Sequence, residues 1–139
     1  MLNTKPVLLV EDDDVDALTV QRSLRDLGAK VQLVRSTNGE EALEYLRNMN
    51  NPIPCIILLD LNMPKMNGIE FLKITGDDER LKNIPVVVFT TTREDCDVIE
   101  SLKLSITGCI FKSFDYQQFL DSMKALQSYW TMSMLPETV

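Results

Sequence analysis

Short, unbroken apolar runs separated by helix-like segments constrain the fold of this chain more than any other feature. The clearest runs are residues 55–59 and 86–89, which contain no charged residue. Strands buried on both faces tolerate such runs, and their alternation with helices is typical of a parallel sheet. We count five such units. They predict a doubly wound α/β fold, in which a five-stranded parallel sheet lies between two layers of helices.

The individual elements follow from local patterns. We expect strands at residues 7–10, 31–34, 55–59, 86–89 and 109–111, and helices at about 15–27, 95–103 and 116–128, with further helices opening near residues 38 and 69. Asn38 is a good helix cap, and the acids after it suit the positive end of a helix dipole. In the first helix the apolar residues at 15, 18, 24 and 27 recur mostly at spacings of three and four residues.

The 139 residues with 45% hydrophobic content are enough for one compact domain. We see no repeat or linker, and expect one domain over 1–139 with a core at about 6–128 and a tail at 129–139. Tyr129 and Trp130 place large apolar groups in this tail. Either the tail extends the last helix and packs on the domain, or it contributes to a dimer or kinase contact.

The net charge of −7 should repel nucleic acids and anionic membranes. The chain shows no signal peptide, which favours the cytoplasm. Cys55, Cys96 and Cys109 are widely spaced without any histidine, so we expect free thiols, with Cys55 and Cys109 buried and inert.

Polar residues follow four of the predicted strands. Glu11 and Asp12 follow the first, and Asp60, Thr90 and Lys112 follow or end the third, fourth and fifth. The carboxyl ends of parallel strands meet at one rim, where ligands bind. Clustered carboxylates suit Mg²⁺ or Mn²⁺, and Mg²⁺ usually takes a phosphoryl oxygen as well. The rim therefore predicts a metal-assisted phosphoryl site with a carboxylate nucleophile.

Four motifs resemble a known family in order along the chain. They are VLLVED at residues 7–12, LLDLNMPKMNG at 58–68, VVVFT at 86–90 and GCIFK at 108–112. Together they resemble the receiver domains of two-component response regulators, from about Pro6 to Ser128. The resemblance implies a flavodoxin-like fold, a three-layer (βα)5 sandwich with strand order 2-1-3-4-5.

The resemblance also implies roles for individual residues. Asp60 would be the phosphoacceptor. The metal ligands would be Glu11, Asp12, Asp60 and the backbone carbonyl of Asn62. The residues at the phosphoryl group or the switch would be Thr90, Thr91 and Lys112.

The implied function is that of a stand-alone response regulator in the cytoplasm. A sensor histidine kinase would donate the phosphoryl group, and a downstream protein or phosphotransfer protein would read the result, with a homodimer also open. The chain would be no enzyme beyond its own phosphorylation and dephosphorylation.

Three positions depart from the family pattern. Ser113 follows Lys112 where proline is usual, Cys109 replaces a frequent switch aromatic, and Thr91 is bulkier than the usual small residue and could narrow access to the site. The pair of Lys112 and Ser113 is similar to small regulators that partner bacterial phytochromes.

Other functions fit less well. An aspartyl phosphohydrolase would need an acid where Asn62 stands, and a flavin or nucleotide binder would need a phosphate cradle that the loops lack. A degenerate receiver that only binds proteins is the alternative left open. Asp13, Asp14 and Asp16 are explained by the start of a helix.

Overall fold

The computed structural model describes residues 5–63, 65–112 and 115–133. A single parallel sheet has the order β2-β1-β3-β4-β5, which confirms the predicted architecture. Its strands are β1 (Val7–Val10), β2 (Leu33–Ser36), β3 (Ile56–Asp60), β4 (Val86–Thr90) and β5 (Gly108–Phe111).

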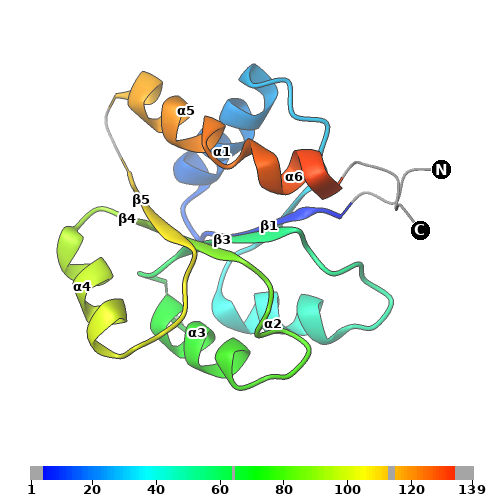
Figure 1. Cartoon of the computed structure of the whole chain (residues 1–139), viewed down its shortest axis with the longest axis vertical. Coiled ribbons are helices and arrows are strands. Elements are labelled where there is room, and N and C mark those ends of the chain that lie inside the picture. Colours follow the sequence, from blue (N-terminus) through cyan, green and yellow to red (C-terminus); the bar gives the residue numbers. More distant parts are fainter. Residues whose placement is uncertain (1–4, 64, 113–114, 134–139) are drawn as a thin grey trace.

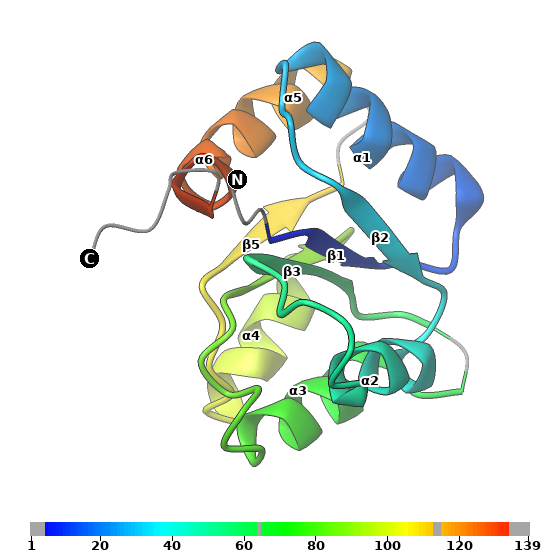
Figure 2. The ribbon, with the colours of Figure 1, turned by 90° about the vertical axis from the view of Figure 1, so that its right-hand side faces the viewer.

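Helices cover both faces of the sheet. They are α1 (Asp14–Asp26), α2 (Gly39–Arg47), α3 (Gly68–Gly76), α4 (Arg93–Ser101), α5 (Tyr116–Lys124) and α6 (Gln127–Ser133). Figure 1 and Figure 2 show α1, α5 and α6 on one face and α2, α3 and α4 on the other. The sheet therefore separates two hydrophobic cores.

The central strands explain the unbroken apolar runs. In β1, Leu8 and Val10 belong to the core beneath α2 and α3, whereas Val7 and Leu9 belong to the core beneath α1 and α5. All four are fully buried. Because alternate side chains point to opposite faces, a strand covered on both sides has no position for a polar residue.

The predicted apolar face of α1 is wrong for Val15 and Leu18 and right for Leu24. Val15 and Leu18 are 70% and 63% exposed, and the buried stripe consists of Ala17, Val20 and Leu24 with Ser23. Val15 and Leu24 are separated by about two and a half helical turns, so they lie on opposite sides of the helix. Leu18 and Leu24 are six residues apart, which is not a spacing that keeps two residues on one helical face.

The second strand lies two residues later than expected, at Leu33–Ser36 instead of 31–34. It pairs with β1 in the register Leu8 to Val34 and Val10 to Ser36. β2 is an edge strand with an exposed Arg35 in it, so it lacks the apolar run that marks the central strands.

The described start of the predicted tail, Tyr129 and Trp130, packs on the domain, so the core extends beyond residue 128. A single helix from Tyr116 to Ser128 was expected, but α5 ends at Lys124 and α6 begins at Gln127. Trp130 of α6 is 1% exposed and joins the core that contains Val7. This residue therefore belongs to the fold.

The expectation of free thiols is wrong for Cys96 and Cys109, and Cys55 and Cys109 are less buried than expected. Cys96 of α4 and Cys109 of β5 form a disulfide with their Cα atoms 6.8 Å apart. Both are half-buried, as is Cys55, which lies outside this pair. Only the packing of α4 beside β5 brings the two thiols together. No helix in the described part of the chain is long and apolar enough to span a membrane.

Candidate functional site

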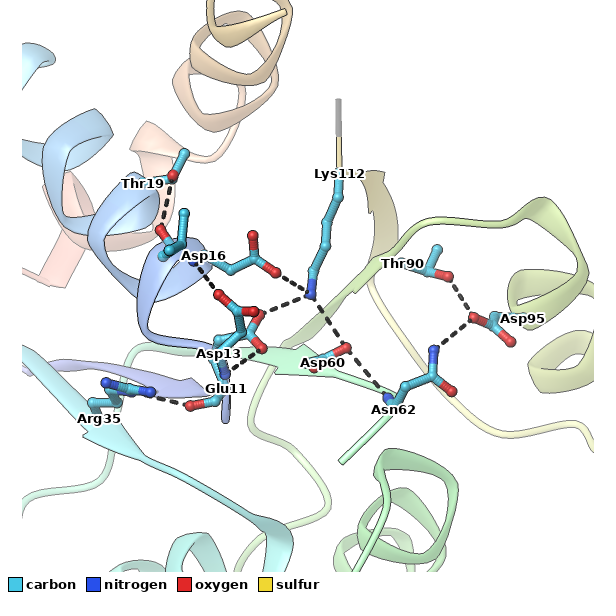
Figure 3. Close-up of polar contacts among 11 residues, drawn as sticks. Glu11, Asp13, Asp16, Thr19, Arg35, Asp60, Asn62, Thr90, Asp95 and Lys112 are labelled. Carbon is cyan, nitrogen blue, oxygen red and sulfur yellow. Dashed lines mark hydrogen bonds and ion pairs between the residues drawn. The ribbon is translucent and has the colours of Figure 1, made fainter. Parts of the chain in front are cut away.

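The register of the sheet brings the predicted residues to one rim. Val10 pairs with Leu59, Asp60 with Phe89, and Thr90 with Phe111, so successive strands end at a common level. The side chains of Glu11, Asp60, Thr90 and Lys112 gather at this rim in Figure 3.

Three acids lie close enough to share a cation. Glu11, Asp12 and Asp60 each offer a carboxylate oxygen, and these oxygens lie within 4.8 Å of one another. Glu11 and Asp60 are 1% and 5% exposed, whereas Asp12 is open to solvent. Hard oxygen donors with one open side suit a divalent cation that keeps some of its waters.

Lys112 neutralises part of this negative charge. Its Nζ lies 2.9 Å from Oε1 of Glu11, 2.9 Å from Oδ2 of Asp16 and 3.5 Å from Oδ1 of Asp60. Burial lowers the pKa of Lys112, but its hydrogen bonds to Asp16 and Glu11 outweigh this and raise the pKa above its ordinary value. The lysine is therefore a permanent cation beside Asp60.

Glu11 has an unusual acidity for a carboxyl group. Burial, together with a hydrogen bond and the charge of Asp60, raises the pKa of Glu11 to about 8 even though Lys112 opposes the shift. Two neighbouring buried carboxylates cannot both ionise cheaply beside one lysine. A divalent cation would supply the missing positive charge, so the acids fit such an ion.

The Thr90 hydroxyl has partners away from Asp60. Thr90 Oγ1 lies 2.5 Å from Oδ2 of Asp95 and 3.1 Å from the backbone oxygen of Thr92. The same Asp95 oxygen accepts a hydrogen bond from Nδ2 of Asn62 at 3.4 Å. Asp95 thus links the loops that follow β3 and β4 (Figure 3).

The loop after Asp60 is held by close backbone packing. The Gly68 amide donates to the backbone oxygen of Leu61 at 3.0 Å, and a Cβ on Gly68 would lie 2.7 Å from Cα of Leu61 and 2.9 Å from the backbone oxygen of Asp60. Asn67 forms a capping box with Glu70 at the start of α3. Asp60 is therefore fixed from both sides, by its strand and by the following helix.

The remaining predicted positions lie around the rim. Thr91 and Asn62 are both exposed. The backbone amide of Asn62 donates to Oδ1 of Asp60 at 3.3 Å. Cys109 is half-buried in its disulfide with Cys96. Ser113 and its peptide bond with Lys112 lie outside the described residues.

The acids assigned to the start of a helix have separate partners. Asp13 caps α1 by accepting from the Asp16 amide at 2.9 Å, and Asp14 pairs with Arg35 at 2.8 Å. Asp16 also binds Lys112 and Asp95 binds Thr90, and neither contact was predicted from the sequence. The signal available was position, because both residues lie in the first turn of a helix that starts at the rim.

Comparison with known proteins agrees with this site. The chain matches the response regulator receiver domain over residues 7–124. Response regulator Rcp1 of Synechocystis sp. is 35% identical over 130 residues, which cover 91% of this chain and 88% of Rcp1.

Solved structures agree as well. The phosphorylated cyanobacterial phytochrome response regulator RcpA has a TM-score of 0.82 at 33% identity and covers 98% of this chain and 100% of its own. The Mn²⁺-bound form of Rcp1 has a TM-score of 0.79 at 34% identity, covering 97% and 98% of the two chains. The chain therefore belongs to the response regulator receiver domains, the phosphoacceptor modules of two-component signalling.

Proposed function

We propose that Asp60 accepts a phosphoryl group from a sensor histidine kinase in a reaction that requires Mg²⁺. The observation that carries this proposal is the position of Asp60. Its carboxylate is nearly buried at the rim, 3.5 Å from the Lys112 ammonium and beside Glu11 and Asp12. A nucleophilic carboxylate, a fixed cation and a set of metal ligands are the groups that phosphoryl transfer to aspartate needs.

The metal would be held by Glu11, Asp12, Asp60 and the backbone carbonyl of Asn62. When bound, Mg²⁺ neutralises negative charge on the phosphoryl oxygens. Mn²⁺ prefers similar oxygen ligands and should substitute for it. Burial and the neighbouring Asp60 raise the pKa of Glu11. A divalent cation held at this position would favour the ionised carboxylate, which supports the assignment.

The chemical step needs only the residues at the rim. An oxygen of Asp60 forms a bond to phosphorus while the bond between phosphorus and the donor's leaving atom breaks. Lys112 then pairs with one phosphoryl oxygen, and the Thr90 hydroxyl donates to another. Thr91, which is exposed beside Thr90, would limit the approach of small donors and water.

A partner protein would recognise the phosphorylated state at the face made by α4, β5 and α5. Val98, Leu102 and Phe111 leave apolar surface on this face, with exposures of 45%, 44% and 40%. Such a patch supports a downstream protein, a phosphotransfer protein or a second copy of the chain as a partner. We place the protein in the cytoplasm as a single receiver unit whose chemistry is limited to its own phosphorylation and dephosphorylation.

The test is labelling with acetyl phosphate, followed by intact mass spectrometry. Wild-type protein with Mg²⁺ is expected to gain the mass of one phosphoryl group, and EDTA or Asp60→Asn is expected to abolish the gain. Asp14→Asn is a matched control, because Asp14 lies near the rim but pairs with Arg35. Undiminished labelling of Asp60→Asn would refute the proposal.

A further inference from the structure

The Thr90 hydroxyl already donates a hydrogen bond to Asp95, a residue outside the predicted site. Thr90 is 1% exposed, and its Oγ1 lies 2.5 Å from Oδ2 of Asp95. The other neighbours of Oγ1 are the backbone oxygen and the amide of Thr92, each at 3.1 Å. A hydroxyl has one proton to donate, and a carboxylate at short distance is the stronger acceptor. The proton therefore lies between Thr90 and Asp95.

Asp95 is held in this orientation from two directions. Its amide donates to Oγ1 of Thr92, the cap of α4, at 3.4 Å, and its Oδ2 accepts from Asn62 at 3.4 Å. An acid in a first turn is also favoured by the helix dipole, which would leave its side chain in solvent. Glu94 in the same turn is exposed, whereas Asp95 is half-buried against Thr90. The contact with Thr90 thus distinguishes Asp95 from an ordinary first-turn acid.

We propose that Asp95 is a positioning residue of the phosphorylation switch. It holds the Thr90 proton in the unphosphorylated protein and must release it before Thr90 can donate to a phosphoryl oxygen on Asp60. This inference rests on the proposed role of Asp60. A single proton cannot serve both acceptors, so Asp95 and the phosphoryl group compete, and Asp95 sets how readily the phosphorylated state forms.

The probe is beryllofluoride, a mimic of the aspartyl phosphoryl group, titrated calorimetrically into the full chain at saturating Mg²⁺. Asp95→Ala removes the competing acceptor and is expected to tighten binding about tenfold, the effect of one hydrogen bond to a charged group. Asp97→Ala removes the same charge from an exposed position of α4 and is expected to keep the wild-type affinity. Circular dichroism checks that each variant is folded.

A double-mutant cycle tests whether Asp95 acts through Thr90. Thr90→Ala removes the hydroxyl proton for which Asp95 and the phosphoryl group compete. Adding Asp95→Ala to this variant is therefore expected to leave the affinity for beryllofluoride unchanged. Asp95→Asn is expected to tighten binding by less than Asp95→Ala, because the amide oxygen still accepts the Thr90 proton without a negative charge. This second variant keeps the size of the original side chain.

Two results overturn the inference. One is wild-type affinity in Asp95→Ala. The other is an equal gain with and without the Thr90 hydroxyl, which would mean that Asp95 acts through its charge alone. If acetyl phosphate labels Asp60 of the wild-type protein, either result rejects only the proposed role of Asp95. Wild-type protein that accepts neither acetyl phosphate nor beryllofluoride defeats the proposed function as well.

Discussion

At the scale of single residues, the groups that would bind a phosphoryl oxygen are engaged elsewhere before phosphorylation. Lys112 is shared among Glu11, Asp16 and Asp60, and Thr90 is held by Asp95. These contacts satisfy buried polar groups that would otherwise be costly. Phosphorylation would therefore exchange existing hydrogen bonds for new ones.

The raised pKa of Glu11 makes the metal-free protein sensitive to pH. The Glu11 pKa is about 8 in the folded protein, against an ordinary value of 4.5. The folded state binds the extra proton, so this stabilising contribution is fully present below pH 4.5 and is lost as the pH rises through about 8. We predict that in EDTA the melting temperature falls across this range, and that Glu11→Gln removes this part of the fall.

The control for this prediction is Glu44→Gln. Glu44 is exposed on α2, so the same chemical change there is expected to leave the pH profile of the melting temperature as in wild type. A wild-type profile for Glu11→Gln would contradict the raised pKa of Glu11.

Some site residues could be predicted from sequence because each ends or follows a strand. Asp60, Thr90 and Lys112 belong to this group, and parallel pairing brings such positions to one rim. Asp16 and Asp95 could not be identified in the same way, because their contacts depend on the direction in which a helical first turn points a side chain.

At the scale of elements, the loop between β3 and α3 depends on Gly68. An added methyl group would meet the backbone of Leu61 and Asp60 at 2.7 Å and 2.9 Å. We predict that Gly68→Ala lowers the free energy of unfolding by about 1–3 kcal/mol, measured by urea denaturation. Gly76→Ala is the control, since no heavy atom lies within 4 Å of its added Cβ. Equal stability of the two variants would rule out this packing constraint.

The corrected face of α1 gives a second prediction at this scale. Leu24 is 5% exposed and Leu18 is 63% exposed. Leu24→Ala is expected to reduce the free energy of unfolding by about 2–5 kcal/mol, and Leu18→Ala by no more than about 0.5 kcal/mol. The measurement is again urea denaturation. A larger loss of unfolding free energy for Leu18→Ala than for Leu24→Ala would mean that Leu18 lies on the buried face of α1.

Elements differ in how far their sequence determines them. The strand at Val7–Val10 was predicted at its observed bounds, and Asn38 caps α2 as expected by accepting from the Glu41 amide. Both signals are local. The edge strand Leu33–Ser36 and the separate α6 depend on pairing and packing with distant residues, so the local pattern misplaced them.

At the scale of the whole molecule, α6 completes the core above β1. Trp130 is 1% exposed in the cluster that also contains Leu9 and Met123. We predict that Trp130→Ala lowers the free energy of unfolding by about 3–5 kcal/mol, because it leaves a large cavity. Met49→Ala, at a residue 76% exposed, is the control and should change stability little. A small loss for Trp130→Ala would mean that α6 is dispensable.

The most direct test of the proposed phosphoacceptor is to locate the phosphoryl group itself. Protein labelled with acetyl phosphate and Mg²⁺ is reduced with borohydride, which converts an aspartyl phosphate to homoserine, and the converted residue is found by peptide mass spectrometry. We predict homoserine at position 60 and unmodified Asp12 in the same digest. Conversion at another acid, or no conversion in protein that is demonstrably labelled, would contradict phosphorylation of Asp60.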